Sequence, residues 1–273
     1  MNKKFLLIAV MVLASISGFA QTRFAVYAGG AFPMGAFKDG KLNDSDYPEK
    51  FVLFNQDAGN KGYAGIGFNV GMDVNIPITD FGLGLTIGAD YFYNGYNAEL
   101  KDYYKDLVDN IEEHIDESDI DSYKLYKGKF MNVPVLVGVN YFLELNDNFG
   151  LFAEAAVGPN FRFITKDGVK YEYTEPQEYY DNNGNLKSYS EAQSYTKFDM
   201  AITFGYKVGV GVMINDMFSI GLDYYSLGST KVKGENKLLY DGDEQKLPND
   251  MKNFKGKKAI ACSEFAIRVG FHF

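Results

Sequence analysis

Strict alternation between apolar residues and small or polar residues is the feature that most constrains the fold of this chain. In the segment 65–76, Ile66, Phe68, Val70 and every second residue after them are apolar, and the residues between them are Gly, Asn or Asp. A repeat of two residues indicates a β-strand, because successive side chains of a strand point to opposite faces. The segment 81–93 repeats the pattern after a tight turn at 77–80. The alternation therefore predicts an antiparallel hairpin.

The same pattern recurs along the chain and predicts eight strands, three pairs of which are joined by short turns. These strands are expected at 24–32, 65–76, 81–93, 131–141, 149–163, 198–214, 218–225 and 264–273. The remaining connections are long and rich in Lys, Asp, Asn, Gly and Tyr, and they cover 33–61, 94–129, 166–197 and 228–258. An even number of strands, with short turns on one side and long loops on the other, is typical of outer-membrane barrels.

The composition of the two strand faces favours a barrel that spans a membrane. The polar face consists mainly of Gly and Asn, and glycine inside a strand costs about 0.5 to 1 kcal/mol relative to alanine. Such a face fits the narrow interior of a closed barrel, which cannot hold many large side chains. The other face carries Val, Ile, Leu, Phe and Tyr, as lipid contact requires. A soluble periplasmic barrel or sandwich is the alternative, but its water-facing side would carry Lys, Glu and Thr.

The N-terminal residues 1–20 are expected to be a cleaved signal peptide, which leaves 21–273 as a single barrel domain. Lys3 and Lys4 precede a short apolar run, and Gly18-Phe19-Ala20 ends it with the small residues of a cleavage site. The apolar run is too short to span a membrane as a helix. Cys262 is the only cysteine, so an internal disulfide is excluded. The net charge of −9 argues against nucleic acid as a partner.

Charged residues on the polar face of the strands predict a network of ion pairs inside the barrel, because buried charges persist only when they are paired. Lys197 also lies on this polar face. The predicted network comprises Asp73, Asp90, Glu154, Arg162, Asp199, Lys207, Asp223, Glu264 and Arg268. The interior of an eight-stranded barrel is just filled by side chains, so a general porin is not expected. A narrow path for ions or protons is the alternative interpretation of this set.

The long connections offer little for catalysis. Only His114 and His272 could act as a general base, and His272 is expected at the periplasmic rim. His114 falls in 98–118, where apolar residues recur at helical spacing after Asn97, a good N-cap. This segment is expected to be an amphipathic helix that covers the barrel rim or meets a partner. A membrane hydrolase or acyltransferase that depends on His114 is a further alternative, but no enzyme activity is expected.

Other loop residues suggest contact surfaces, and no cofactor is expected. Asp116, Asp119 and Asp121 are weak candidates for Ca²⁺, because the spacing of an EF-hand is missing and a solvated acidic face explains them. The lysines of 228–258 could pair with acidic loops or contact lipopolysaccharide phosphates. A cluster of tyrosines could contact a sugar or a protein, and it comprises Tyr171, Tyr173, Tyr179 and Tyr180.

The C-terminal residues and three strands carry a resemblance to known outer-membrane barrels. The last strand resembles the signal read by the barrel-assembly machinery, and its residues are Phe265, Ile267, Val269, Phe271 and Phe273. The segments 131–141, 150–159 and 205–212 resemble the small Bacteroidetes outer-membrane beta-barrel domain, often called PorT-like, and more distantly the OmpA-type transmembrane barrel. Pro134 and Pro159 lie within these strands and are interpreted as bulges.

The resemblance implies an eight-stranded, antiparallel, up-and-down transmembrane β-barrel with long extracellular loops. It places the chain in the outer membrane of a Gram-negative bacterium of the Bacteroidetes, with both termini in the periplasm. The partners it implies are membrane lipid, lipopolysaccharide, the assembly machinery and a protein bound through the loops. The expected role is a non-enzymatic one, either structural in the envelope or binding through the loops. The alternatives are an accessory subunit of an outer-membrane secretion or assembly machine and, less favoured, a narrow channel.

Overall fold

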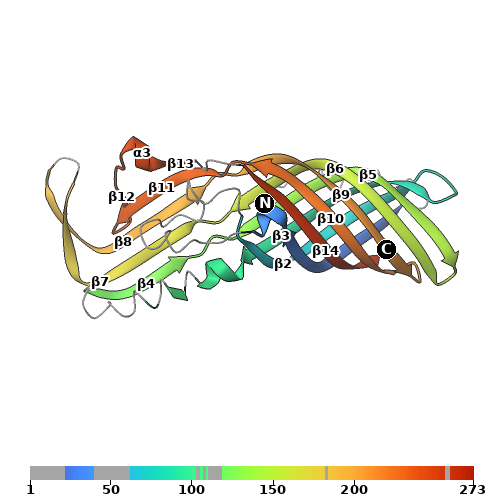
Figure 1. Ribbon diagram of the computed structural model, residues 1–273, viewed down its shortest axis with the longest axis horizontal. Helices are drawn as coiled ribbons and strands as arrows, with labels where there is room; N and C mark the ends of the chain where they lie inside the picture. The colour runs from blue at the N-terminus through green and yellow to red at the C-terminus, as the bar shows by residue number, and fades with distance from the viewer. Residues whose placement is uncertain are drawn as a thin grey trace.

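Eight strands close into an antiparallel barrel, in the order β1-β14-β10-β9-β6-β5-β3-β2 (Figure 1). This computed structural model describes residues 22–39, 62–102, 105, 106, 109, 119–181, 184–255 and 259–273. The wall strands are β1 (Arg23–Met34), β2 (Ala64–Pro77), β3 (Leu83–Tyr96), β5 (Phe130–Asn146), β6 (Phe149–Ile164), β9 (Ala201–Ile214), β10 (Phe218–Thr230) and β14 (Ile260–His272). Each of the eight predicted strands coincides with one of them, so the predicted fold class is confirmed.

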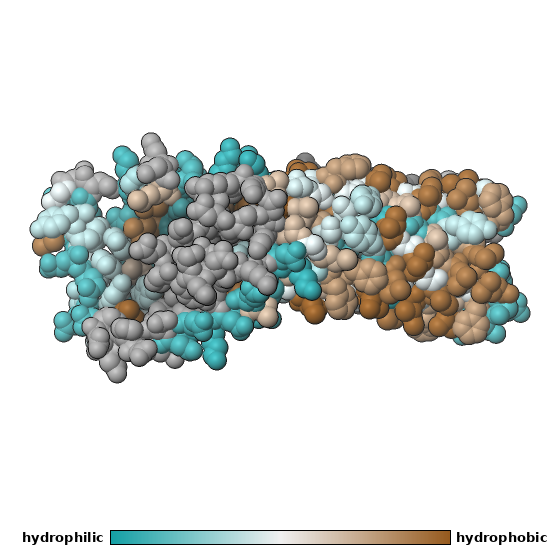
Figure 2. All heavy atoms as spheres, viewed as in Figure 1, coloured by the Kyte–Doolittle hydropathy of each residue, from teal (hydrophilic) through white to brown (hydrophobic). Residues whose placement is uncertain are grey.

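The two faces of each wall strand differ in exposure as the alternation requires. In β2, the outward side chains of Ile66 and Met72 are 73% and 63% exposed, whereas the inward side chains of Asn69 and Asp73 are 0% and 1% exposed. Figure 2 shows hydrophobic side chains gathered on the barrel half of the molecule and hydrophilic ones on the other half and at the turns. The exposed apolar side chains form a band around the barrel, which is the surface that a bilayer covers.

Short turns join the wall strands at one end of the barrel, which we call the turn end. The β9–β10 turn places Asn215 and Asp216 at φ 51° and 54°, the left-handed region that a tight hairpin needs. The β2–β3 turn is longer than predicted, because β3 begins at Leu83 and Phe81 lies in the turn. Both described ends of the wall also lie here, where the Phe273 N–H donates to the Phe24 carbonyl over 2.8 Å.

The two prolines in the wall do not produce bulges, which corrects the interpretation from sequence. Pro134 pairs with Asn160 in the same register as Val137 with Val157, so no residue is inserted between them. Pro159 of β6 pairs with Phe204 of β9 in an unbroken register. Bulges occur elsewhere, for example between Ser226 and Ser229 of β10. A proline removes one donor from the ladder, and here the flanking pairs keep the strands aligned without an inserted residue.

Much of the long connections folds into a second sheet at the other end, which we call the sheet end. Its order is β12-β11-β8-β7-β4, and β13 pairs with β11. The strands are β4 (Ile120–Tyr126), β7 (Asp167–Tyr180), β8 (Leu186–Phe198), β11 (Lys233–Tyr240), β12 (Asp243–Glu244) and β13 (Asn253–Lys255). The expectation of loops over these ranges is therefore wrong. Strands β4, β7, β8 and β11 lead directly into, or continue, the wall strands β5, β6, β9 and β10, so one side of the wall is prolonged beyond the barrel (Figure 1).

Helical structure in the described residues is short. A 3-10 helix, η1 (Gly35–Phe37), follows β1, and α3 (Asn249–Lys252) precedes β13. Residues 98–102, 105, 106 and 109 are helical, and the Leu100 N–H donates to Oδ1 of Asn97 over 3.1 Å, as the predicted N-cap requires. The rest of the predicted helix, including His114, lies outside the described residues. No helix among the described residues has the length and apolar character to cross a membrane.

Candidate functional site

The lumen of the barrel is organised in layers from the turn end to the sheet end. At the turn end, a cavity of about 570 Å³ opens among Arg23, Asn75, Asn140, Phe142 and neighbouring turn residues. Above it, Phe152 fills the space beside Gly211, because its ring meets the position that a Cβ would take there. Charged side chains follow in the next layer, and an aromatic cluster lies beyond them. A cavity therefore occupies the turn end of the described lumen.

The charged layer brings together six of the nine residues predicted for the lumen network. Arg268 of β14 is central: Nε lies 2.6 Å from Asp223 Oδ2, and Nη1 lies 3.1 Å from Asp90 Oδ1. Its Nη2 lies 3.0 Å from Glu154 Oε1. Lys207 Nζ lies 2.8 Å from the same Glu154 oxygen and 3.4 Å from Asp73 Oδ2. All six side chains are buried, so these pairs are shielded from water and salt.

Neutral groups complete the charged layer. The Tyr225 hydroxyl donates to Asp90 Oδ2 over 3.0 Å, and the Asn69 amide donates to Asp90 Oδ1 over 3.4 Å. Sequence reasoning missed both residues, although Tyr225 follows Asp223 by two positions and therefore faces the same way. Four carboxylates share two cations in this layer. The arrangement holds the wall together, because the charged groups come from β2, β3, β6, β9, β10 and β14.

Glycines make room for the carboxylates. A methyl group at Gly88 would overlap Oδ1 of Asp73, and one at Gly209 would overlap Oδ1 of Asp223. Gly71 stands in the same relation to Asp90. The glycines that the sequence predicts on the inner face thus have a specific structural role. Each of these glycines lies beside a carboxylate of the network and leaves the volume into which that carboxylate folds.

The other three predicted network residues lie elsewhere. Arg162 and Glu264 are buried, but no ion pair involves either of them among the residues that the structure describes. The Arg162 guanidinium instead donates to Asn132 Oδ1 and to the Ile260 and Gly228 carbonyls, over 3.3 to 3.4 Å. The prediction that Asp199 lies in the lumen is wrong. It is exposed between β8 and β9, because β9 begins at Ala201, three residues later than expected. Lys197 is likewise an exposed residue of β8.

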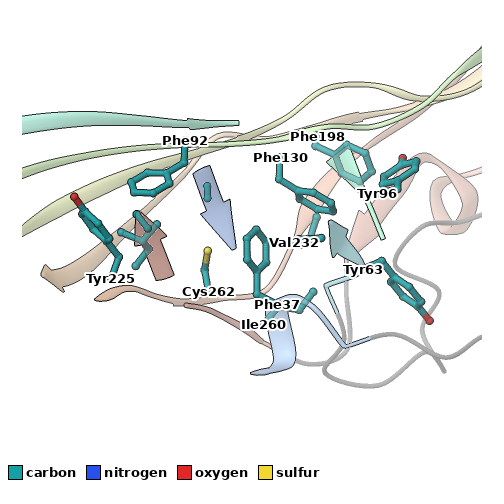
Figure 3. Close-up of a cluster of buried hydrophobic side chains, with 14 of the residues drawn as sticks. Phe37, Tyr63, Phe92, Tyr96, Phe130, Phe198, Tyr225, Val232, Ile260 and Cys262 are labelled. Carbon is teal, nitrogen blue, oxygen red and sulfur yellow. The ribbon is translucent and has the colours of Figure 1, made fainter. Parts of the chain in front are cut away.

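An aromatic cluster fills the sheet end of the lumen (Figure 3). The Phe92 and Tyr225 rings meet edge to face with centroids 4.7 Å apart, just above the charged layer. Nearer the sheet end, Phe37 of η1 meets Phe130 in the same way at 5.4 Å. Each of these four side chains is at most 2% exposed. The charged layer and the aromatic cluster are therefore both built from buried side chains of the described lumen.

The remaining predicted candidates lie at separate places where the structure describes them. His272 is buried, and its Nε2 lies 2.8 Å from Ser219 Oγ near the turn end. Asp119 and Asp121 lie at the start of β4 and are exposed, while Asp116 and His114 lie outside the described residues. Among the described residues, no group of three or more His, Cys, Asp or Glu side chains is placed to hold a metal ion. The C-terminal aromatic and aliphatic residues point outward, and Val269 and Phe273 are 58% and 69% exposed.

Tyrosines gather on the second sheet, across β7, β8 and β11. The rings of Tyr189 and Tyr240 are stacked with centroids 4.1 Å apart, and Tyr179 lies 4.5 Å from Tyr240. Tyr173 meets the Tyr189 ring edge to face at 5.6 Å, and Tyr171 lies beside Tyr173. Three of the four predicted contact tyrosines therefore join one cluster. The fourth, Tyr180, is 74% exposed at the end of β7.

Ion pairs also stabilise the second sheet. Lys170 Nζ lies 2.8 Å from Glu172 Oε1 and 2.7 Å from Glu191 Oε2. These hydrogen bonds raise the pKa of Lys170 above its ordinary value. Hydrogen bonds from Lys170 and Ser122 hold the pKa of Glu172 below its ordinary value. Lys237 forms a similar pair with Glu244 at 2.6 Å and lowers the pKa of that carboxyl.

Comparison with known proteins identifies one matching family model. A model described as outer membrane protein beta-barrel domain matches residues 19–231. No curated protein matches the chain in sequence. Among solved structures, the chain is similar to the outer membrane protein OprG from Pseudomonas aeruginosa, with 14% identity and a TM-score of 0.42 over 92% of this chain and 95% of that one.

Two further solved structures show a comparably distant similarity. Ail, the attachment invasion locus protein of Yersinia pestis, is 12% identical with a TM-score of 0.37, and the match covers 93% of this chain and 99% of that one. Neisserial surface protein A is 10% identical with a TM-score of 0.36, and the match covers 92% of this chain and 97% of that one.

Proposed function

Because the chain belongs to the outer membrane protein beta-barrel domain family, we propose that it is a non-enzymatic, non-conducting barrel that presents its second sheet outside the cell as a binding surface. In this arrangement residues 1–20 are removed as a leader, and 21–273 form the mature barrel. Both termini and the short turns face the periplasm. The outward residues of β14, ending at Phe273, serve as the assembly signal.

One observation carries this proposal: the wall extends beyond the apolar band as an ordered sheet. The neighbour order β10-β9-β6-β5 in the wall is repeated as β11-β8-β7-β4 in the second sheet. A flexible loop loses conformational entropy when it binds, whereas an ordered sheet has already lost it. The tyrosine cluster adds rings with polar tips, which suit contact with a protein or a sugar. The extended sheet is therefore a preorganised surface rather than a set of flexible loops.

The lumen supports the non-conducting part of the proposal. A conducting pore needs a water-filled path, and in this barrel the Arg268 network and the aromatic cluster occupy the interior. In planar bilayers, the mature chain should show no stable openings at neutral pH. Openings whose conductance changes in Lys207→Ala would contradict the proposal and favour a narrow channel.

Orientation and contact can be tested in intact cells. We would place a photo-crosslinking residue at Tyr180, at the exposed end of β7, and at Asp80 in the turn at the opposite end. Tyr180 should crosslink to extracellular or cell-surface components, and protease added to intact cells should cut the β7–β8 hairpin. If Asp80 alone yields a defined adduct with subunits of a secretion or assembly complex, the protein is an accessory subunit and the surface role is wrong.

A further inference from the structure

The backbone pairing between β9 and β10 stops before the two strands reach the second sheet. Their register runs from Phe218 opposite Ile214 to Ser226 opposite Tyr206. Pairing between the two chain segments resumes only in the second sheet, where Gly234 of β11 lies opposite Phe198 of β8. Residues 199–205 and 227–233 are described and share no register in between. After its bulge, β10 continues beside β14 alone.

A cavity of about 250 Å³ occupies this break. Apolar side chains line one part of it, including Ile164, Met200 and Ile202, and the exposed residues Lys231 and Lys233 line another. The chain stays connected across the break through a hydrogen bond from the Asp199 N–H to the Lys233 carbonyl, over 2.9 Å. The break is therefore an ordered part of the fold, and the cavity in it has an apolar side and a cationic side.

The cavity lies at the edge of the apolar band. The outward residues of β9 are exposed and apolar from Val212 to Phe204, and Ile202 and Met200 extend the same row with 62% and 52% exposure. Beyond Met200 towards the sheet end, the exposed residues of this region are Asp199 and the lysines Lys197, Lys231 and Lys233. The apolar band of an outer-membrane barrel marks the hydrocarbon, so the cavity lies where acyl chains meet headgroups.

The cationic side of the cavity has an excess of positive charge. Lys233 lies directly opposite Lys255 of β13, and like charges in that position repel each other. In the part of the chain that the structure describes, no ion pair involves Lys231, Lys233 or Lys255. Asp199 is the one acidic residue among those that line the cavity. An anion bound here would relieve the repulsion.

We propose that this cavity binds the anionic phosphate headgroup of a lipid in the leaflet at the sheet end. Lys231 and Lys233 would contact the phosphate, while an acyl chain would follow Ile202 and Phe204 along the wall. A lipid can contact both the lysines and the apolar side chains of the cavity, whereas a soluble anion would contact only the lysines. The inference rests on the family membership of the chain and does not depend on what the second sheet binds.

The test measures lipid retention by native mass spectrometry of the full mature chain in detergent, with phosphatidylglycerol or phosphatidylcholine added. Wild type should retain phosphatidylglycerol in preference to phosphatidylcholine, and added salt should reduce this retention. The double variant Lys231→Gln/Lys233→Gln should bind phosphatidylglycerol about thirtyfold more weakly, since each lysine at a membrane surface contributes about a factor of five. The conservative variant Lys231→Arg/Lys233→Arg should bind as wild type does.

The matched control is Lys124→Gln/Lys187→Gln, which removes the same charge from two exposed lysines of the second sheet. It should retain phosphatidylglycerol as wild type does, and all variants should keep a heat-modifiable band in electrophoresis. Equal retention by Lys231→Gln/Lys233→Gln and wild type would overturn the proposal. So would displacement of the lipid by inorganic phosphate at the same concentration, because the site would then recognise an anion without its acyl chain.

Discussion

The Nη1 atom of Arg268 lies 3.1 Å from Oδ1 of Asp90, although the two residues are 178 positions apart in the sequence. Arg268 belongs to β14 and Asp90 to β3, which are not neighbours in the wall. The same guanidinium also reaches Asp223 of β10 and Glu154 of β6. One side chain thus connects non-adjacent strands through the lumen, in addition to the hydrogen bonds that join adjacent strands around the wall.

Replacing Arg268 with Met should strongly destabilise the barrel. Among the described residues, the substitution removes the cation that pairs with Asp90 and Asp223 and leaves Glu154 with Lys207 alone. Breaking a buried pair in this way costs about 3 to 5 kcal/mol. Urea titration in detergent can measure the change in the free energy of unfolding. Maleimide labelling of Cys262 provides the readout, because this single cysteine is 1% exposed in the folded chain.

The control for this experiment is Arg23→Met. Arg23 pairs with Asp216 at 3.9 Å, and both side chains are substantially exposed. Exposed pairs of this kind contribute about 0 to 1 kcal/mol, so the urea midpoint should change little. Equal losses in Arg23→Met and Arg268→Met would show that the lumen network has no special part in stability.

Gly88→Ala should destabilise the barrel, whereas Gly95→Ala in the same strand should not. A methyl group at Gly88 would overlap the Asp73 carboxylate, but one at Gly95 would meet no atom within 4 Å. Overpacking a filled interior costs about 1 to 3 kcal/mol. The urea midpoints of the two variants provide the comparison. If Gly88→Ala is as stable as Gly95→Ala, room for the carboxylates is not the reason for the glycines on the inner face.

Asn97→Ala should loosen the start of the helix that follows β3. Oδ1 of Asn97 accepts a hydrogen bond from the Leu100 N–H, and loss of an N-cap costs about 1 kcal/mol. Amide exchange at Leu100 should therefore become faster, while Asn97→Asp, which keeps an acceptor oxygen, should protect this amide. Faster exchange in both variants would instead implicate the second bond of Asn97, from its amide to the Lys38 carbonyl over 3.1 Å.

The second sheet should lose stability in acid before the barrel does. The pKa of Glu172 and that of Glu244 lie below the ordinary value of 4.5, because Lys170 and Lys237 hydrogen-bond to the carboxylates. A lowered pKa in the folded state stabilises the fold above the ordinary pKa, and this contribution is lost as the pH falls through the lowered value. Protection factors of the β7, β8 and β11 amides should therefore decrease as the pH falls below the ordinary pKa of 4.5 and through the lowered values.

The matching substitution for the acid experiment is Glu172→Gln. It should reduce the pH dependence of the amide protection factors in β7 and β8, and it should leave the pH dependence of the protection factors near Glu244 unchanged. The raised pKa of Lys170 acts at the opposite end of the pH range. Its contribution is complete below the ordinary value of 10.5 and is lost as the pH rises through the raised value. Protection that stays constant through the acidic range would show that these exposed pairs do not stabilise the sheet.

The strands of the barrel wall could be predicted because the pattern that defines each strand lies within its own short segment of the sequence. The alternation in segments such as 65–76 assigns each side chain to one face, and the composition of the faces decides which one contacts lipid. For the same reason, Asp73, Asp90 and Arg268 could be placed in the lumen without knowledge of their partners. Their partners depend on the strand order and the shear of the closed barrel, which no local pattern contains.

The sequence by itself determined the closed antiparallel barrel, its eight strands and the charged, glycine-rich lumen. The tertiary structure alone decided that Arg268 lies among three carboxylates, that Asp199 lies outside the lumen, and that the connections 166–197 and 228–258 form largely a second sheet. In β7 and β8 the alternation is weak, because both faces carry tyrosines and charges. These strands lie side by side because each directly follows or precedes a wall strand in the chain, and the neighbour order of the wall strands is a property of the closed barrel.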